Sequence, residues 1–421
     1  MSRLLYTALA AALLASVAGT ASTAQAGEPE WIRQFGTLQD DAAAGVAVGP
    51  DGRVHVAGYT YGHFGAYKGS TDTLVVTFDR DGNELWRRQP GTTTVDSLLH
   101  IATDAAGNVF LVGATDGALG GANKGSRDAF IMAFDRDGRT LWSRQPGTTS
   151  YEYAHAVATD AAGNVYVAGT TGGALGGSNQ GRSDAFVIKY DHDGRMLWKR
   201  QPGTVDSDEA TGVATDADGN VYLAGYTRGS LGGAKTGSFD VFLIKFDRDG
   251  HALWKRQPGS VYQDYATGVA TDGDGNVYVA GRTWGALGGK WKVSEDGFLI
   301  KFDRDGRTLW KRQPGTRSYD SASDVATDAE GNVYMVGRTN GSLGGLHMGA
   351  NDAIVIKYDR DGHNLWRDQP ATTGDDWAAG VAVDADGNAY VVGYTSGSLP
   401  GYVNLGKADA FLIKYAPGGP R

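Results

Sequence analysis

The sequence predicts an all-β fold, a seven-bladed β-propeller of four-stranded blades whose last blade is closed by the N-terminal strand. Three observations support this prediction. A tryptophan recurs seven times at nearly constant spacing, every repeat contains four short strand-like segments, and the segment missing from the last repeat stands near the start of the chain. A closed ring of such sheets leaves few strand edges exposed.

The tryptophan spacing gives the number of repeats. One step of 55 residues is followed by five steps of 56. A fixed period of this length indicates a repeat architecture, so we expect residues 27–421 to form a single propeller domain. Each blade needs a large apolar residue beside its neighbour, which predicts that these tryptophans are core residues. They are Trp31, Trp86, Trp142, Trp198, Trp254, Trp310 and Trp366.

Each repeat contains the signals of two β-hairpins. In residues 212–259 the segments GVAT, VYLAGYT, DVFLIKFD and HALWKRQPG are separated by the turn DADGN, a glycine-rich loop and the turn RDG. Asp-Gly and Gly-Asn pairs favour tight reversals. The third segment is apolar on both faces, as expected for a sheet packed between two others. Frequent glycines argue against helices.

The two ends of the chain predict how the ring closes. The last repeat stops after residues 409–415 and lacks the LWKRQPG segment, whereas residues 30–37 read as that segment with no repeat before it. We therefore expect the N-terminal segment to pair with the last repeat and to complete its sheet.

The first 26 residues are typical of a signal peptide. Arg3 precedes an apolar stretch over residues 4–17, and Ala24-Gln25-Ala26 forms a small-residue cleavage site. We expect cleavage near Ala26 and a secreted or periplasmic product. No later apolar run is long enough to cross a bilayer, so no transmembrane span is expected.

Composition excludes several classes of function. The net charge of -9 argues against a nucleic-acid partner, because such binding depends on lysine and arginine. The absence of cysteine excludes disulfides and thiolate metal sites. The eight histidines occupy scattered positions with no metal triad, and no serine nucleophile motif is present. We expect no cofactor, and a monomer.

The repeat also resembles a known family. The pattern D-x-A-x-G-V-A-T-D-x-x-G-N-V-Y-V-A-G-x-T followed by D-A-F-x-I-K-Y-D-x-D-G-x-x-L-W, as in residues 208–254, resembles the SBBP family of bacterial β-propeller repeats. This resemblance covers nearly all of residues 27–421. It implies the propeller fold and an exported or surface location, and it implies no shared activity or ligand.

The two ends of the predicted ring differ in character. The turns DADGN and DRDG fall on one end. The segment after QPG and the long glycine-rich loop fall on the other, which we call the glycine-loop face. Propellers usually bind ligands at the mouth of the central channel, so the candidate sites lie on this face.

An acidic residue opens the first strand of every repeat. This ring could bind a hard cation such as calcium, because oxygen-rich sites suit such ions. Alternatively, each acid accepts backbone N–H bonds from its own loop. We favour the second interpretation, since a residue repeated in every blade serves the blade more simply than a single ligand. The ring is Asp41, Asp96, Glu152, Asp208, Asp264, Asp320 and Asp376.

Positions that vary between repeats are the candidate ligand contacts. They follow the second strand or open the first, and they are rich in aromatic residues and arginine, which stack on sugars or hold peptides. The alternative is neutral drift in exposed loops. The candidates are Tyr59, Tyr61, Tyr226, Arg228, Arg282, Trp284, Arg338, Tyr394 and Trp377.

The sequence favours an exported, non-enzymatic binding or interaction scaffold that uses the glycine-loop face to bind an extracellular glycan or protein. The alternative is a hydrolase or lyase that acts on an extracellular glycan or other polymer at the channel mouth, with two carboxylates of the ring, such as Asp208 and Asp264, as acid and base. A third possibility is that the repeats serve only stability and display.

Overall fold

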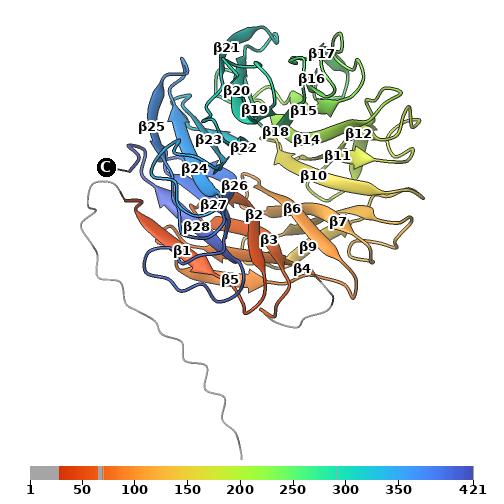
Figure 1. Ribbon diagram of the computed structural model, residues 1–421. Helices are drawn as coiled ribbons and strands as arrows, with labels where there is room; N and C mark the ends of the chain where they lie inside the picture. The colour runs from red at the N-terminus through yellow and green to blue at the C-terminus, as the bar shows by residue number, and fades with distance from the viewer. Residues whose placement is uncertain (1–27, 65–68, 70, 292, 421) are drawn as a thin grey trace, which may run out of the picture.

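The computed structural model describes residues 28–64, 69, 71–291 and 293–420 and confirms the predicted fold. Seven four-stranded antiparallel sheets are arranged radially in a ring, and the described residues contain no helix (Figure 1). Consequently none of the described residues belongs to a helix long and apolar enough to cross a membrane. The expected signal peptide, residues 1–26, and Gly27 lie outside the described residues.

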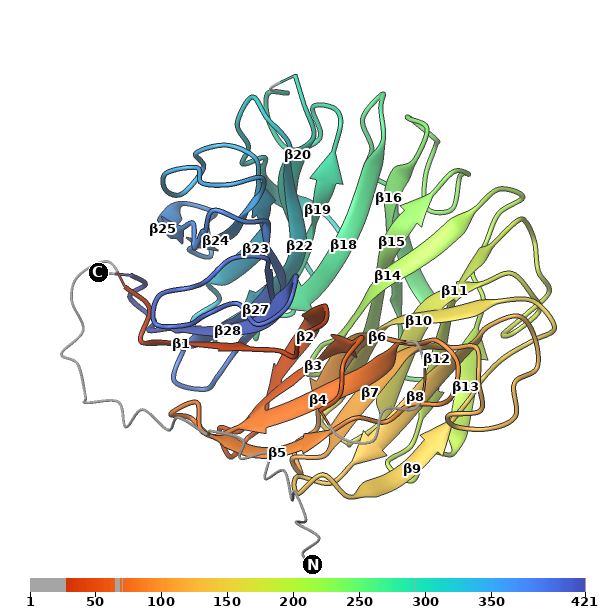
Figure 2. The ribbon, with the colours of Figure 1, turned by 60° about the horizontal axis from the view of Figure 1, so that its bottom comes forward.

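The strands fall into four classes by distance from the ring axis (Figure 2). The innermost strands are β2 (Asp41–Val48), β6 (Asp96–Thr103), β10 (Glu152–Thr159), β14 (Asp208–Thr215), β18 (Asp264–Thr271), β22 (Asp320–Thr327) and β26 (Asp376–Val383). The second strands are β3 (Val54–Thr60), β7 (Val109–Thr115), β11 (Val165–Thr171), β15 (Val221–Thr227), β19 (Val277–Thr283), β23 (Val333–Thr339) and β27 (Ala389–Thr395).

The outer half of each sheet is built in the same order. The third strands are β4 (Asp72–Phe78), β8 (Asp128–Phe134), β12 (Asp184–Tyr190), β16 (Asp240–Phe246), β20 (Asp296–Phe302), β24 (Asp352–Tyr358) and β28 (Asp409–Tyr415). The outermost strands are β5 (Glu84–Arg88), β9 (Thr140–Arg144), β13 (Met196–Arg200), β17 (Ala252–Arg256), β21 (Thr308–Arg312), β25 (Asn364–Asp368) and β1 (Trp31–Phe35). We number the blades 1 to 7 from β2–β5 onward, so that blade 7 contains β26–β28 and β1.

The N-terminal strand closes the ring as predicted. Strand β1 pairs antiparallel with β28, from Trp31 opposite Lys414 to Phe35 opposite Ala410. The order of the sheet is β1-β28-β27-β26, so the two ends of the chain meet in blade 7. This pairing covers the edge that β28 would otherwise expose.

The core lies between neighbouring sheets. Most third strands are buried along their whole length, as expected from their apolar residues on both faces. The repeated tryptophans pack against these clusters and are partly buried. Trp198 shows why: its ring contacts Tyr166, while its Nε1 donates a hydrogen bond to the Arg248 carbonyl in the next blade, 3.0 Å away. The tryptophans therefore join blades as well as fill space.

A β-bulge interrupts every innermost strand. In blade 4 the pairing of β14 with β15 skips from Ala210 to Gly212, and the same shift recurs in the other six blades. A bulge places one extra residue opposite the partner strand and changes the direction of the side chains around it. The bulged residue, Thr211 in this blade, lines the central channel.

Candidate binding site at the channel mouth

The acidic ring is buried and hydrogen bonded inside each blade. Asp208 is fully buried and accepts bonds from the Thr204 N–H at 2.6 Å, the Thr204 hydroxyl at 2.9 Å and the Thr227 hydroxyl. Burial raises the pKa of Asp208, and these hydrogen bonds oppose that rise. This arrangement matches the interpretation in which each acid serves its own loop. Calcium binding at the ring stays a prediction.

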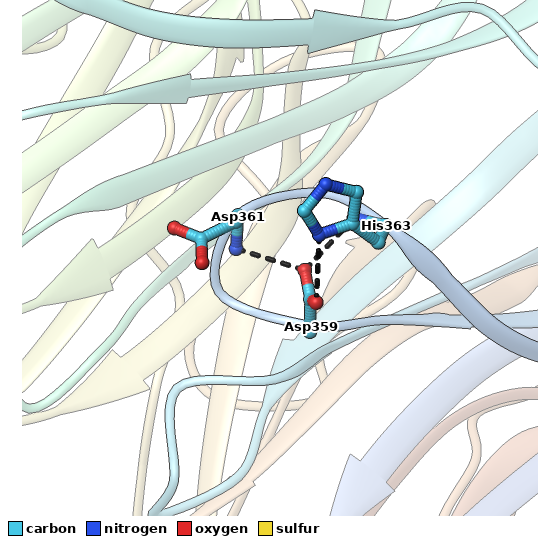
Figure 3. Close-up of side chains that lie close together, drawn as sticks. All are labelled: Asp359, Asp361 and His363. Atoms are coloured by element: carbon cyan, nitrogen blue, oxygen red, sulfur yellow. Dashed lines mark hydrogen bonds and ion pairs between the residues drawn. The ribbon is translucent and has the colours of Figure 1, made fainter.

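A different acidic group, drawn in Figure 3, lies in the turn between β24 and β25. Asp359, Asp361 and His363 are close enough to hold a cation. Asp359 accepts bonds from the Asp361 and His363 N–H groups at 2.9 and 2.8 Å, and its other oxygen is 2.9 Å from His363 Nδ1. Asp247 and His251 make the same contacts in blade 4. The group is therefore explained by turn chemistry that the repeats share.

A cavity of about 420 Å³ lies at the glycine-loop mouth of the channel. Three of the sequence-predicted candidates line it: Arg282 and Arg338, from the ends of β19 and β23, and Trp377, from the start of β26. Its floor consists of innermost-strand residues, among them Thr267 and Ser323. Three neighbouring blades therefore contribute the three large side chains of one cavity.

Arg338 and Trp377 form the best-defined contact in this cavity. The Arg338 guanidinium carbon lies 4.5 Å from the centre of the Trp377 ring, within the range of a cation–π interaction. Trp377 Nε1 donates a hydrogen bond of 2.5 Å to the Ser323 hydroxyl. Tyr394 meets the Trp377 ring edge-on at 6.0 Å, and its hydroxyl donates to Asp375 at 3.0 Å. These contacts fix the orientation of the indole ring.

Arg282 belongs to a second group of stacked side chains. Its guanidinium lies 4.9 Å from the centre of the Tyr265 ring, which meets Tyr226 at 4.8 Å. The Tyr226 hydroxyl donates to Glu209 at 2.5 Å. Arg282 also lies 3.7 Å from buried Glu295. Burial raises the pKa of Glu295, and the positive charge of Arg282 partly opposes this rise.

The other candidates lie outside the cavity. Arg228 stacks on Phe239 at 4.9 Å, beside the Tyr226 group. Trp284 meets Tyr319 at 5.7 Å. Tyr59 and Tyr61 contact each other edge-on at 6.0 Å, and Tyr61 is exposed. The structure therefore brings three of the nine candidates into one cavity and leaves the rest around it.

The sequence alone did not indicate three titratable residues that line the channel. His100, His155 and Asp324 line a narrower cavity of about 130 Å³ deeper in the channel. Val157 N–H donates to His100 at 3.4 Å, and Val381 N–H donates to Asp324 at 3.1 Å. Burial lowers the pKa of both histidines to about 4 and raises the pKa of Asp324 to about 6. At neutral pH the two histidines are therefore uncharged.

The fold and this site define a β-propeller with a ligand-sized cavity at one mouth of its channel. The chain belongs to the SBBP β-propeller repeat family. Six of the seven repeats match the family, and together they cover about half of the chain. The matches are residues 30–65, 141–177, 197–232, 253–289, 309–344 and 366–400.

Two curated proteins are similar in sequence. The regulatory protein FlaEY of Caulobacter vibrioides is 27% identical over 286 residues, which is 57% of this chain and 30% of that protein. An uncharacterized WD repeat-containing protein, L264, of Acanthamoeba polyphaga mimivirus is 21% identical over 467 residues, which is 83% of this chain and 34% of that protein. The chain thus spans about a third of the length of each relative.

Solved structures share the fold. The WD40 β-propeller domain of Doa1 superposes with a TM-score of 0.52 and 10% identity, covering 91% of this chain and 96% of that domain. At this level of identity the likeness concerns the fold alone.

Proposed function

We propose that the protein is an exported, non-enzymatic binding scaffold that captures an extracellular glycan or protein on its glycine-loop face. One observation carries the proposal: Arg282, Arg338 and Trp377 stand at positions that differ from blade to blade, and they line a single cavity at the channel mouth. Arginine and tryptophan are the residue types that most often dominate binding energy. Export is supported by the sequence of residues 1–26.

The geometry gives less support to the hydrolase or lyase alternative. An acid and a base must reach the substrate within hydrogen-bond distance. Asp208 and Asp264, the carboxylates considered for these roles, are fully buried, and both accept hydrogen bonds from nearby threonine or serine hydroxyl groups. A binding role requires no such access and uses only the half-buried side chains of the cavity.

A binding screen with two matched variants tests the proposal. The purified protein is exposed to panels of oligosaccharides and peptides, and thermal unfolding reports capture, since a ligand at about 100 times its Kd adds roughly 2.7 kcal/mol of stability. We expect Trp377→Ala to weaken binding of any ligand found. Trp291→Ala removes an equal, exposed ring that does not line the cavity and should bind as the parent protein does.

Two results would count against the proposal. One is equal affinity of the parent protein and Trp377→Ala, with both proteins folded. The other is the absence of any saturable binding across both panels. Turnover of a captured polymer would instead revive the enzymatic alternative.

A further inference from the structure

We infer that the cavity at the channel mouth binds a uronic acid residue of an anionic glycan, with the carboxylate held by Arg338 and Arg282 and the sugar ring beside Trp377. This inference rests on the proposed binding function and specifies its ligand. Only blades 5 and 6 place arginine at this position of the second strand; the other five blades have Tyr59, Ala114, Thr170, Tyr226 and Tyr394. At this position the positive charge is therefore confined to two neighbouring blades.

The two arginines have hydrogen-bond donors to spare. Arg338 stacks on Trp377 and makes no hydrogen bond with any described residue. The Arg282 side chain is 40% exposed, and its acidic neighbour Glu295 lies 3.7 Å from its Nη1 atom, beyond hydrogen-bond distance. A planar guanidinium matches the two oxygens of a carboxylate. A bound carboxylate would therefore accept hydrogen bonds from terminal N–H groups that the described residues leave unpaired.

Arg338 is available to a negatively charged ligand. Glu295 is buried 3.7 Å from Arg282, whereas Arg338 forms no ion pair with a described residue. The attraction between a guanidinium and a carboxylate is stronger in a partly desolvated site than in water. One carboxylate of the ligand would give Arg338 the ionic partner that the described residues do not provide.

The remaining lining fits a hydroxylated ring. Thr211 and Thr267 donate their hydroxyl hydrogens to backbone carbonyls at 2.9 and 3.0 Å, so their oxygens can still accept hydrogen bonds. Ser323 accepts from Trp377 Nε1, which leaves its own hydrogen available. Trp377 supplies an aromatic surface, and about 420 Å³ falls within the usual range for small-ligand sites. An acidic peptide would also use the arginines, but it carries no ring with several hydroxyl groups to place against Trp377 and these three side chains.

Titration calorimetry with the purified protein tests this inference. The probes are trimers of galacturonate, mannuronate and guluronate, together with the methyl ester of the binding trimer, which keeps its size and hydroxyl groups. We expect saturable binding of at least one acid trimer. Affinity should fall at least about tenfold for the methyl ester and for Arg338→Gln, because both remove a charge-assisted hydrogen bond. The control, Arg317→Gln, removes an exposed arginine of the same face that does not line the cavity and should leave affinity unchanged.

The outcomes separate this inference from the function on which it rests. Equal binding of acid and ester, or unchanged binding by folded Arg338→Gln, overturns carboxylate recognition and leaves the scaffold proposal intact. The inference also fails if no uronate trimer binds while a neutral glycan or a tetraglutamate peptide binds in a Trp377-dependent way. If no glycan or peptide binds at all, the scaffold proposal fails with it.

Discussion

At the scale of single residues, equivalent positions in different blades fill the same buried space with different side chains. In blades 3 to 7 a tyrosine donates to an aspartate of its own blade, as Tyr222 does to Asp216 at 2.9 Å. In blades 3 to 6 a lysine also contacts that carboxylate, as Lys245 does at 3.5 Å, whereas Lys414 of blade 7 contacts Glu30 instead. In blade 2 the Tyr and Lys positions hold Phe110 and Ala133. In blade 1 they hold His55 and Thr77, whose side chains are 2.8 Å apart. Blade 2 thus provides an apolar version of the same buried pair.

The buried histidine predicts acid sensitivity. Burial lowers the pKa of His55 from 6.5 to about 4. The unfolded chain therefore binds a proton that the folded chain rejects, and stability falls as pH drops from 6.5 toward 4. We expect the double variant, His55→Phe with Thr77→Ala, to lack this loss. On acidification from neutral pH to about pH 4, its free energy of unfolding should therefore fall by roughly 3 kcal/mol less than that of the parent protein. Urea unfolding at pH 7.5 and 4.5 measures the difference.

An exposed histidine provides the control for this pH dependence. His192→Ala should show the same loss of stability on acidification as the parent protein, because its side chain is exposed. If the double variant and the parent lose stability equally between pH 7.5 and 4.5, the buried His55 is not a source of the acid sensitivity.

The acidic ring makes a second prediction at this scale. Asp208→Ala leaves the Thr204 N–H and the Thr227 hydroxyl without an acceptor in a buried site. We expect a loss of about 3 kcal/mol in the free energy of unfolding. A chelator should leave the thermal midpoint of the parent protein unchanged, since both carboxylate oxygens of Asp208 already accept hydrogen bonds. A calcium-dependent rise in that midpoint that disappears in Asp208→Ala would assign a cation site to the ring.

Sequence reasoning found part of the site and missed part of it for physical reasons. Arg282, Arg338 and Trp377 were predictable because they differ among otherwise similar repeats. The bulged residues His155, Thr267 and Ser323 were not. An ordinary strand alternates its two faces, and a bulge breaks this alternation at a position that the sequence does not mark. No sequence period could therefore indicate which residues face the channel.

At the scale of strands, the outermost strand joins each blade to the next. Arg200 donates to the carbonyls of Gly250 and Asp249 at 2.7 and 3.1 Å, and Trp198 donates beside it to Arg248. Blade 6 departs from this pattern because Asp368 replaces the arginine and accepts a bond from Tyr415 at 2.9 Å. Blades 6 and 7 are therefore joined by a hydrogen bond between two side chains in place of the arginine–carbonyl bonds.

This difference provides a matched pair of variants. Trp198 Nε1 has a carbonyl acceptor in the next blade, whereas Trp366 Nε1 is buried without one. Both tryptophans become slightly smaller when replaced by phenylalanine, and only Trp198→Phe loses a hydrogen bond between blades. We expect Trp198→Phe to cost about 1 kcal/mol more than Trp366→Phe. Urea denaturation of the two variants under one set of conditions measures this difference; equal costs would show that the hydrogen bond does not stabilise the blade contact.

At the scale of the whole molecule, seven copies make the fold far easier to predict than the ligand. A weak strand signal repeated seven times gives a reliable architecture, and the displaced LWKRQPG segment predicts where the ring closes. The ligand depends on side chains that occur once, such as Arg338 and Trp377, and repetition gives no information about those. Closing the ring affects the stability of every blade, because each sheet packs on two neighbouring sheets only when the ring is complete.

The closing strand leads to a prediction about the complete ring. Deleting residues 28–36 removes β1 and exposes the edge of β28, so we expect a thermal midpoint lower by about 5 °C or more, with increased aggregation. The control moves the strand: residues 37–415 are followed by a copy of the turn Asp247–His251 and then by residues 29–36, because β16 and β17 are joined in this way. This permuted chain should regain most of the lost stability, since it restores the same pairing with different connectivity. If deletion leaves the midpoint unchanged, or if the permuted chain is no more stable than the deleted one, the pairing of β1 with β28 does not hold the ring closed.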